Sequence, residues 1–103
     1  MAERFLTSKG YKILERNWQA GHREIDLIAL KDNTVIFIEV KAAISRAFGH
    51  PIEKVNRSKR DNLIKAARDF IERKNFRGCD FQFDVITFYE GCLEHYKDAF
   101  SAE

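Results

Sequence analysis

The chain has 103 residues, of which 45% are hydrophobic and 33% are charged, and its formal net charge at pH 7 is +2. This length and composition predict one soluble globular domain spanning residues 1–103 and exclude an intrinsically disordered chain. The total charge is too small to argue for binding to a polyanion, so the distribution of charge along the chain matters more.

No apolar run approaches the length of a membrane span, and the first residues lack the cationic start and apolar segment of a signal peptide. We therefore expect a cytoplasmic protein with no membrane partner. The two cysteines, Cys79 and Cys92, have neither the number nor the spacing of a zinc site or a disulfide scaffold, and we expect reduced thiols.

The first part of the chain predicts a short helix followed by three strands. Residues 2–9 suit a helix that ends at Gly10, because glycine accepts the left-handed conformation found at helix ends. Residues 11–18 are predicted to form a first strand. Residues 24–30 and 35–41 are rich in β-branched and apolar side chains and flank a polar turn, which is typical of a β-hairpin. The three strands predict an antiparallel meander.

The register of this hairpin places two acids opposite each other. If Asp32 and Asn33 form a two-residue turn, then Asp26 lies directly opposite Glu39 and Glu24 opposite Lys41. Like charges placed this way destabilise a sheet. A divalent cation between Asp26 and Glu39 would explain the arrangement.

Side chains alternate between the two faces of a strand, so the hairpin is expected to have two different faces. One face is predicted to be apolar throughout and to need a covering helix. It consists of Ile25, Leu27, Ala29, Ile36, Ile38 and Val40. The other face carries apolar residues at one end and Glu24, Asp26, Glu39 and Lys41 at the other. This charged end is a candidate site.

The second half predicts a loop at 42–51, a helix, and a strand at 80–89. Apolar residues recur at helical spacing from Leu63 to Ile71, and this helix is expected to cover the apolar face of the hairpin and to end at Gly78. Residues 92–96 are predicted to form a short edge strand. Asp84 lies among apolar neighbours, so we expect it to be buried with a partner, and we expect His95 to be structural.

The start of the long helix is rich in cations, and two interpretations of them remain open. These cations are Lys54, Arg57, Lys59 and Arg60. Solvation with local ion pairing is the usual explanation for such a surface, and contact with a phosphate backbone is the second. His50 lies in the preceding loop and is a candidate for substrate contact.

Asp26 and the sequence Glu39-Val40-Lys41 resemble the active-site signature of the PD-(D/E)xK nucleases, the restriction-endonuclease-like superfamily. Hydrolysis of a phosphodiester requires an in-line water and stabilisation of charge on the phosphate oxygens. A divalent cation held by carboxylates does both, and Asp26 and Glu39 would be its primary ligands. The backbone carbonyl of Val40 can serve as a further metal ligand. Lys41 shares a face with Glu39 and can orient the attacking water or stabilise developing charge.

The chain as a whole resembles the YraN-type predicted endonucleases, a family of small bacterial proteins of this nuclease superfamily. The matching segments are residues 10–14 with Arg16 and Asn17, residues 24–29, 35–41 and 47–49, the helix around Lys59, residues 83–85, and residues 93–95 with Ala99 and Phe100. The resemblance implies an α/β fold with a restriction-endonuclease-like α-β-β-β-α-β core. Relatives often carry a glutamine after the lysine that matches Lys59, where this chain has Arg60.

The resemblance also implies a site that hydrolyses DNA with Mg²⁺ or Mn²⁺ at Asp26, Glu39 and Lys41, with Glu24 as a neighbouring acid. In related nucleases a glutamate of the first helix can join the metal site, and Glu3 lies about one turn beyond that position. Glu24 has an equal alternative as the ion-pair partner of Lys41. Branched, flapped or single-stranded DNA is expected in preference to a specific duplex sequence.

Two other functions stay open. A module of nuclease fold could bind nucleic acid or a protein partner without turnover, and a purely structural subunit is the third alternative. The oligomeric state is also open, with a homodimer as one alternative, because symmetric cutting of a junction would call for two copies.

Overall fold

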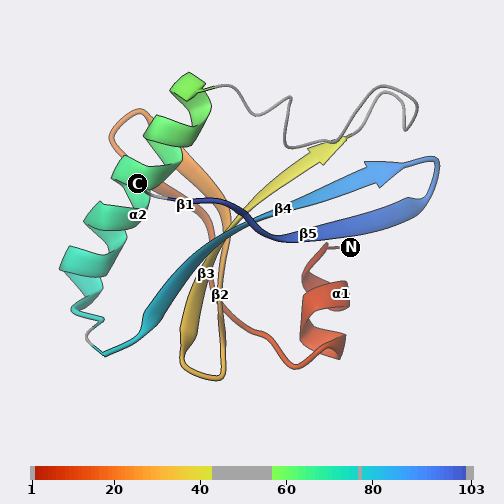
Figure 1. The fold of residues 1–103 in the computed structure, drawn as a ribbon, viewed down its shortest axis with the longest axis horizontal. Coiled ribbons are helices and arrows are strands. Elements are labelled where there is room, and N and C mark those ends of the chain that lie inside the picture. The colour runs from red at the N-terminus through yellow and green to blue at the C-terminus, as the bar shows by residue number, and fades with distance from the viewer. Residues whose placement is uncertain (1, 43–56, 77, 102–103) are drawn as a thin grey trace.

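The chain forms one sheet whose five strands lie in sequence order, with two helices (Figure 1). A computed structural model describes residues 2–42, 57–76 and 78–101. The elements are α1 (Ala2–Ser8), β1 (Lys12–Ala20), β2 (Arg23–Lys31), β3 (Thr34–Ala42), α2 (Arg57–Lys74), β4 (Asp80–Tyr89) and β5 (Cys92–Phe100). Only β3 and β4 pair in parallel, across the connection that contains α2. The predicted α-β-β-β-α-β order of elements is confirmed. The last strand, which was predicted at residues 92–96, extends to Phe100.

The register of the β2–β3 hairpin is confirmed. Lys31 pairs with Thr34 and Leu30 with Val35, so Asp32 and Asn33 form a two-residue turn in which Asp32 has a φ of +56°. Asn33 also fixes this turn to the start of β4, because its backbone carbonyl accepts the N–H of Asp80 at 2.9 Å.

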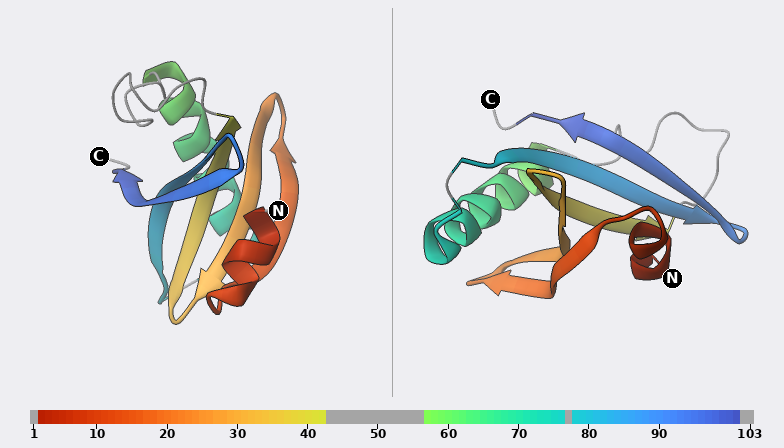
Figure 2. Two further views of the ribbon diagram at one scale, coloured as in Figure 1. Left: turned by 90° about the vertical axis from the view of Figure 1, so that its right-hand side faces the viewer. Right: turned by 90° about the horizontal axis from the view of Figure 1, so that it is seen from below.

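The two helices lie on opposite faces of the twisted sheet (Figures 1 and 2). The apolar side of α2 packs on the face that carries Ile28, Val35 and Phe37. The short α1 packs through Leu6 on the other face, which Leu27, Ala29, Ile36 and Ile38 line. The prediction that the long helix covers this second face was therefore wrong. Both hairpin faces are apolar enough to need cover, and the sequence pattern did not distinguish which helix supplies it.

Both helices end in left-handed residues whose bonds satisfy the last free carbonyls. After α1, Gly10 has a φ of +91° and the N–H of Tyr11 donates to the carbonyl of Leu6 at 3.0 Å. After α2, Asn75 has a φ of +54°. The predicted end at Gly78 was wrong, because asparagine tolerates this conformation and stops the helix three residues earlier. No helix in the described ranges is both long enough and apolar enough to cross a membrane.

Asp84 is fully buried and accepts several hydrogen bonds, as its apolar neighbours in the sequence predict. His95 Nε2 lies 2.7 Å from Oδ2, while Gln82 Nε2 and the backbone N–H of Asp98 donate to Oδ1, each at 2.8 Å. The His95 side chain is only 7% exposed. Asp84 and His95 therefore join β4 to β5, and the prediction of a structural role for both is confirmed.

Both edge strands of the sheet are irregular. In β5, Asp98 takes a φ of +52°, and the register with β4 shifts between Phe83 and Val85. In β1, the register with β2 shifts between Ile13 and Glu15. The shifts leave one extra residue on β1 and two on β5, and such β-bulges bend the strand and disrupt the ladder locally.

We predict that Asp84→Ala lowers the free energy of unfolding by about 3 kcal/mol, because it leaves the buried His95 ring and the Asp98 N–H without their acceptor. Urea denaturation measures the loss. Asp69→Ala is the matched control, since Asp69 forms only a solvent-accessible i,i+4 pair with Arg73 and should cost about 0.5 kcal/mol or less. Equal losses in the two variants would contradict the assigned role of Asp84.

Candidate active site

The β2–β3 ladder stops where the acids begin. Its last pair is Leu27 with Ile38, after which β2 continues only on β1 and β3 only on β4. Asp26 and Glu39 come next along this register, but the ladder does not include the predicted pair. Here Asp26 Oδ2 accepts the backbone N–H of Val40 at 2.8 Å. A side-chain carboxylate thus takes the place of a backbone acceptor, and the two strands separate around it.

Side-chain alternation along β2 breaks at the same residue. Leu27 packs on the α1 side, but Ile25, two residues earlier, packs on the α2 side. Regular alternation would put both on one face, so the predicted placement of Ile25 was wrong. Asn17, which the β1–β2 register sets opposite Asp26, has a φ of +48°. Asp26 lies at this reversal, and it lines a cavity on each side of the sheet.

The cavity on the α2 side has a volume of about 390 Å³ and contains both predicted carboxylates, Asp26 and Glu39. Its remaining polar lining comes from the turn before β2, the start of β2 and the first turns of α2: His22, Arg23, Glu24, Ser58, Lys59 and Asn62. Both signs of charge therefore meet in one pocket.

Glu39 is the most deeply buried acid of this cavity. Its side chain is 8% exposed, and Lys59 Nζ lies 3.0 Å from Oε1. Burial raises the pKa of the Glu39 carboxyl, Lys59 opposes this rise, and the negative charge of Asp26 adds to it. The net effect is a carboxyl with a raised pKa whose charged form is disfavoured unless further positive charge is supplied.

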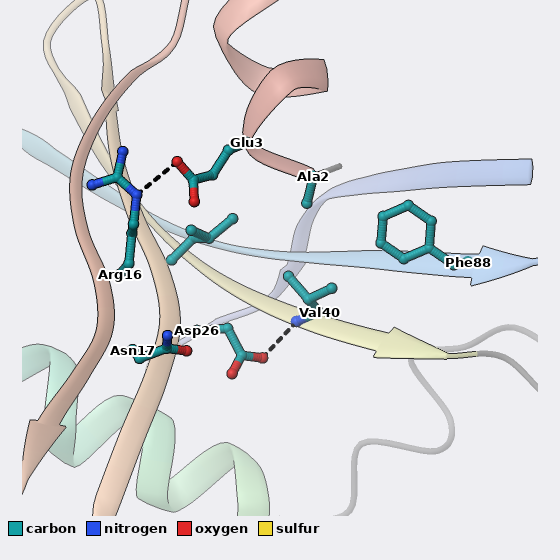
Figure 3. Close-up of a pocket in the computed structure, with 8 residues that line it drawn as sticks. Ala2, Glu3, Arg16, Asn17, Asp26, Val40 and Phe88 are labelled. Carbon is teal, nitrogen blue, oxygen red and sulfur yellow. Dashed lines mark hydrogen bonds and ion pairs between the residues drawn. The ribbon is translucent and has the colours of Figure 1, made fainter. Parts of the chain in front are cut away.

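The cavity on the α1 side has a volume of about 420 Å³ (Figure 3). Glu3 of α1 lines it together with Asp26, Asn17 and Arg16, and Arg16 Nε donates to Glu3 Oε1 at 2.7 Å. The auxiliary acid inferred from the family resemblance thus lies in a cavity that Asp26 also lines. Glu3 does not line the α2-side cavity that contains Glu39.

The remaining predicted residues divide into two groups. Glu24 and Lys59 line the α2-side cavity, whereas Lys41, half-buried on β3, is not among the described residues that line it. The ladder does not extend to the predicted pairing of Glu24 with Lys41; Glu24 instead pairs with Gln19, and Lys41 with Thr87.

The basic cluster at the start of α2 is also divided. Lys59 contacts Glu39, but Arg57 and Arg60 line a separate cavity near Ser101. Lys54 and His50 lie outside the described residues, so their predicted roles stay untested.

Sequence reasoning missed Arg23, Ser58 and Asn62, which line the cavity. By strict alternation Arg23 belongs to the same face as Leu27, away from α2. The reversal at Asp26 brings it to the α2 side. The sequence did contain a signal for Ser58 and Asn62. Ser58 directly precedes Lys59, and Asn62 follows it by three residues on the same helix, so both lie close to the predicted cation.

The possible metal ligands are few. Among residues 2–42, 57–76 and 78–101, no group of three or more His, Cys, Asp or Glu side chains lies close enough to hold a metal ion. Asp26 and Glu39 are the two predicted side-chain ligands at this cavity, and His22 and Glu24 line it as well without completing a cluster of three with them. Further ligands would have to come from the backbone, as predicted for Val40, or from water and substrate.

Comparison with known proteins gives one consistent match. The model described as "Uncharacterised protein family UPF0102" matches residues 1–88, which include Asp26 and Glu39. A UPF0102 protein of Sulfurihydrogenibium sp. strain YO3AOP1 is 41% identical over 102 residues, covering 99% of this chain and 89% of that protein. A UPF0102 protein of Chloroherpeton thalassium is 50% identical over 87 residues, covering 84% and 67%. One of Clostridium perfringens is 40% identical over 108 residues, covering 97% and 87%.

We predict that Glu39→Gln raises the melting temperature at neutral pH by an amount on the order of a few degrees. Because the pKa of Glu39 is raised in the folded state, the wild type is most stable with this carboxyl protonated and loses stability as pH rises through that pKa. The difference should vanish below pH 4.5, the ordinary pKa of glutamate.

Thermal melts across a pH series measure this difference. Glu72→Gln removes the same charge from an exposed position on α2 and serves as the control. A Glu39→Gln variant that melts below this control at neutral pH would show that the ion pair with Lys59 outweighs burial.

Proposed function

The chain belongs to the uncharacterised protein family UPF0102, which is the YraN-type family that its sequence resembles, and we propose that it is a divalent-metal-dependent nuclease acting on DNA. Family membership supplies no reaction, so the proposal rests on the chemistry of the site. The observation that carries it is the meeting of Asp26 and Glu39 in one cavity, at the point where β2 and β3 separate.

The residues present fit Mg²⁺ or Mn²⁺. Both are hard cations that prefer carboxylate and carbonyl oxygens. The negative charge of Asp26 helps to raise the pKa of the Glu39 carboxyl, which is the effect that a cation between them would relieve. When bound, the cation would supply positive charge beside the phosphate and activate a water for attack.

Each protein group has a defined task in this proposal. Asp26 is oriented by the Val40 N–H through one oxygen, and the other lone pairs of its carboxylate are the ones proposed to bind the cation. Glu39, which now contacts Lys59, would be the second residue to hold the cation. Lys41, two residues along β3, is proposed to stabilise charge on the phosphate. Glu24 and Glu3 are auxiliary acids on the two sides of the sheet.

The proposed substrate is DNA in a branched, flapped or single-stranded form. No base-reading motif is recognised in the sequence, so contacts to the phosphate backbone should dominate. Lys59 lines the cavity and is proposed to make such a contact, whereas Arg57 and Arg60 line a separate cavity and would touch a strand only beyond the first one. We place the activity in the cytoplasm, where bacterial DNA lies.

We predict that the wild type cleaves such DNA when Mg²⁺ or Mn²⁺ is added, and that Asp26→Ala and Glu39→Ala each reduce the rate by at least about a hundredfold. Gel assays on branched, flapped, single-stranded and linear duplex DNA measure cleavage. Arg68→Ala, at an exposed position on α2, is the control that should cleave like the wild type. Cleavage that survives the two acid substitutions would come from another site or a contaminant.

A binding module without turnover is the second candidate. It is favoured by the described residues' lack of a three-residue ligand cluster and by the Lys59 ammonium, which already contacts Glu39. Such a module would bind DNA with an affinity that falls with salt and does not respond to divalent metal.

Metal-dependent stability separates the two candidates. For the nuclease, Mn²⁺ should raise the melting temperature of the wild type, with a gain of about 2.7 kcal/mol when free metal is about 100 times its dissociation constant. Asp26→Asn and Glu39→Gln should abolish the gain, and the surface variant Glu72→Gln should retain it. A wild type whose melting temperature ignores Mn²⁺ would favour the binding module.

A further inference from the structure

Arg23 contributes an unusual group to the α2-side cavity. It is the first residue of β2, directly after the turn at Gly21 and His22, and it lines the cavity together with Asp26 and Glu39. Its Nε atom is buried and has no hydrogen-bond partner. Within the part of the chain that the structure describes, it is the one side-chain nitrogen or oxygen in that condition.

A buried guanidinium N–H without an acceptor is unfavourable, because arginine stays charged at all physiological pH values and its donors lose their hydration. Such groups are rare in folded proteins, and those that occur are found at catalytic sites, in strained segments, or beside bound water or ions. Because Nε itself is covered, the arginine side chain has to turn toward the cavity that it lines before a bound ligand can supply the missing acceptor. Arg23 therefore indicates a place where an anionic oxygen belongs.

The other polar residues of the cavity indicate that this anion is a phosphate. Ser58 and Asn62, from the first turns of α2, line the same cavity and carry a hydroxyl and an amide that can donate hydrogen bonds. The planar edge of a guanidinium matches two oxygens of a phosphate. Phosphate is also the group that a DNA strand would bring to Asp26 and Glu39.

We propose that Arg23, with Ser58 and Asn62, forms a phosphate-binding subsite that holds the DNA strand beside the two carboxylates. This inference rests on the proposed function. The phosphate is either an internal phosphodiester or a terminal phosphate, since both present the same oxygens to Arg23. The subsite is specific to the α2 side of the sheet, because the reversal at Asp26 directs the start of β2 there.

The test measures binding of fluorescent single-stranded oligonucleotides with and without a 5′-phosphate, in EDTA and again with Ca²⁺. Arg23→Met removes the guanidinium and keeps an apolar stem, Arg23→Lys keeps the charge without the planar edge, and Arg68→Met is the control at an exposed position on α2. We expect Arg23→Met to weaken binding about tenfold or more and to reduce the salt slope by about one, with Arg68→Met close to the wild type.

Stability gives an independent measurement. Arg23→Met removes an unpaired buried donor, so its melting temperature should equal or exceed that of the wild type. If Arg23→Met does not fold, Arg23→Lys supplies the affinity measurement and should still bind more weakly than Arg68→Met. If both Arg23 variants bind the oligonucleotides as tightly as Arg68→Met does, the proposed subsite is overturned.

The outcomes also separate the subsite from the nuclease proposal. Binding that depends on Arg23 in a protein that cleaves nothing with Mg²⁺ or Mn²⁺ supports the subsite and overturns the nuclease. Metal-dependent cleavage with wild-type kinetics in both Arg23 variants supports the nuclease and overturns the subsite. Dependence on Arg23 for the phosphorylated oligonucleotide alone identifies a terminal phosphate, and dependence for both identifies an internal phosphodiester.

Discussion

The site depends on the hydrogen bond from the Val40 N–H to the Asp26 carboxylate. A backbone N–H inside a sheet must find an acceptor, and in a continued ladder that acceptor would be a carbonyl of β2. Because Asp26 supplies it instead, β2 and β3 can separate without leaving a donor unpaired. The same bond fixes the Asp26 side chain between the two faces of the sheet, where cavities from both sides reach it.

Separation of the strands places charge where a packed sheet would have apolar side chains. Glu39 is almost fully covered and lies near a second carboxylate, and its raised pKa records the cost of keeping it ionised. Arg23 and Lys59 bring positive charge to the same cavity, yet Arg23 keeps an unpaired nitrogen. Unfavourable groups of both signs in one pocket are typical of sites that bind a charged ligand, because the ligand completes the pairing.

Sequence reasoning predicted the hairpin register near the turn, the proximity of Asp26 and Glu39, the bounds of β4 and the burial of Asp84, because these follow from turn residues and local patterns. It did not predict which helix covers which face, since both faces of the hairpin are apolar near the turn. It also placed Ile25 on the wrong face and missed Arg23. Both errors follow from the reversal at Asp26, which depends on contacts with β1 and β3 and leaves no trace in the alternation of β2.

The bulges of β1 and β5 also bear on how copies of this chain could associate. These strands form the two open edges of the sheet, and an edge with regular, unpaired N–H and carbonyl groups can extend into the sheet of a neighbouring molecule. Bulges and left-handed residues at Asn17 and Asp98 interrupt that regular spacing. A continuous intermolecular sheet is therefore disfavoured at both edges, which leaves the helices and loops as the better surfaces for contact between two copies.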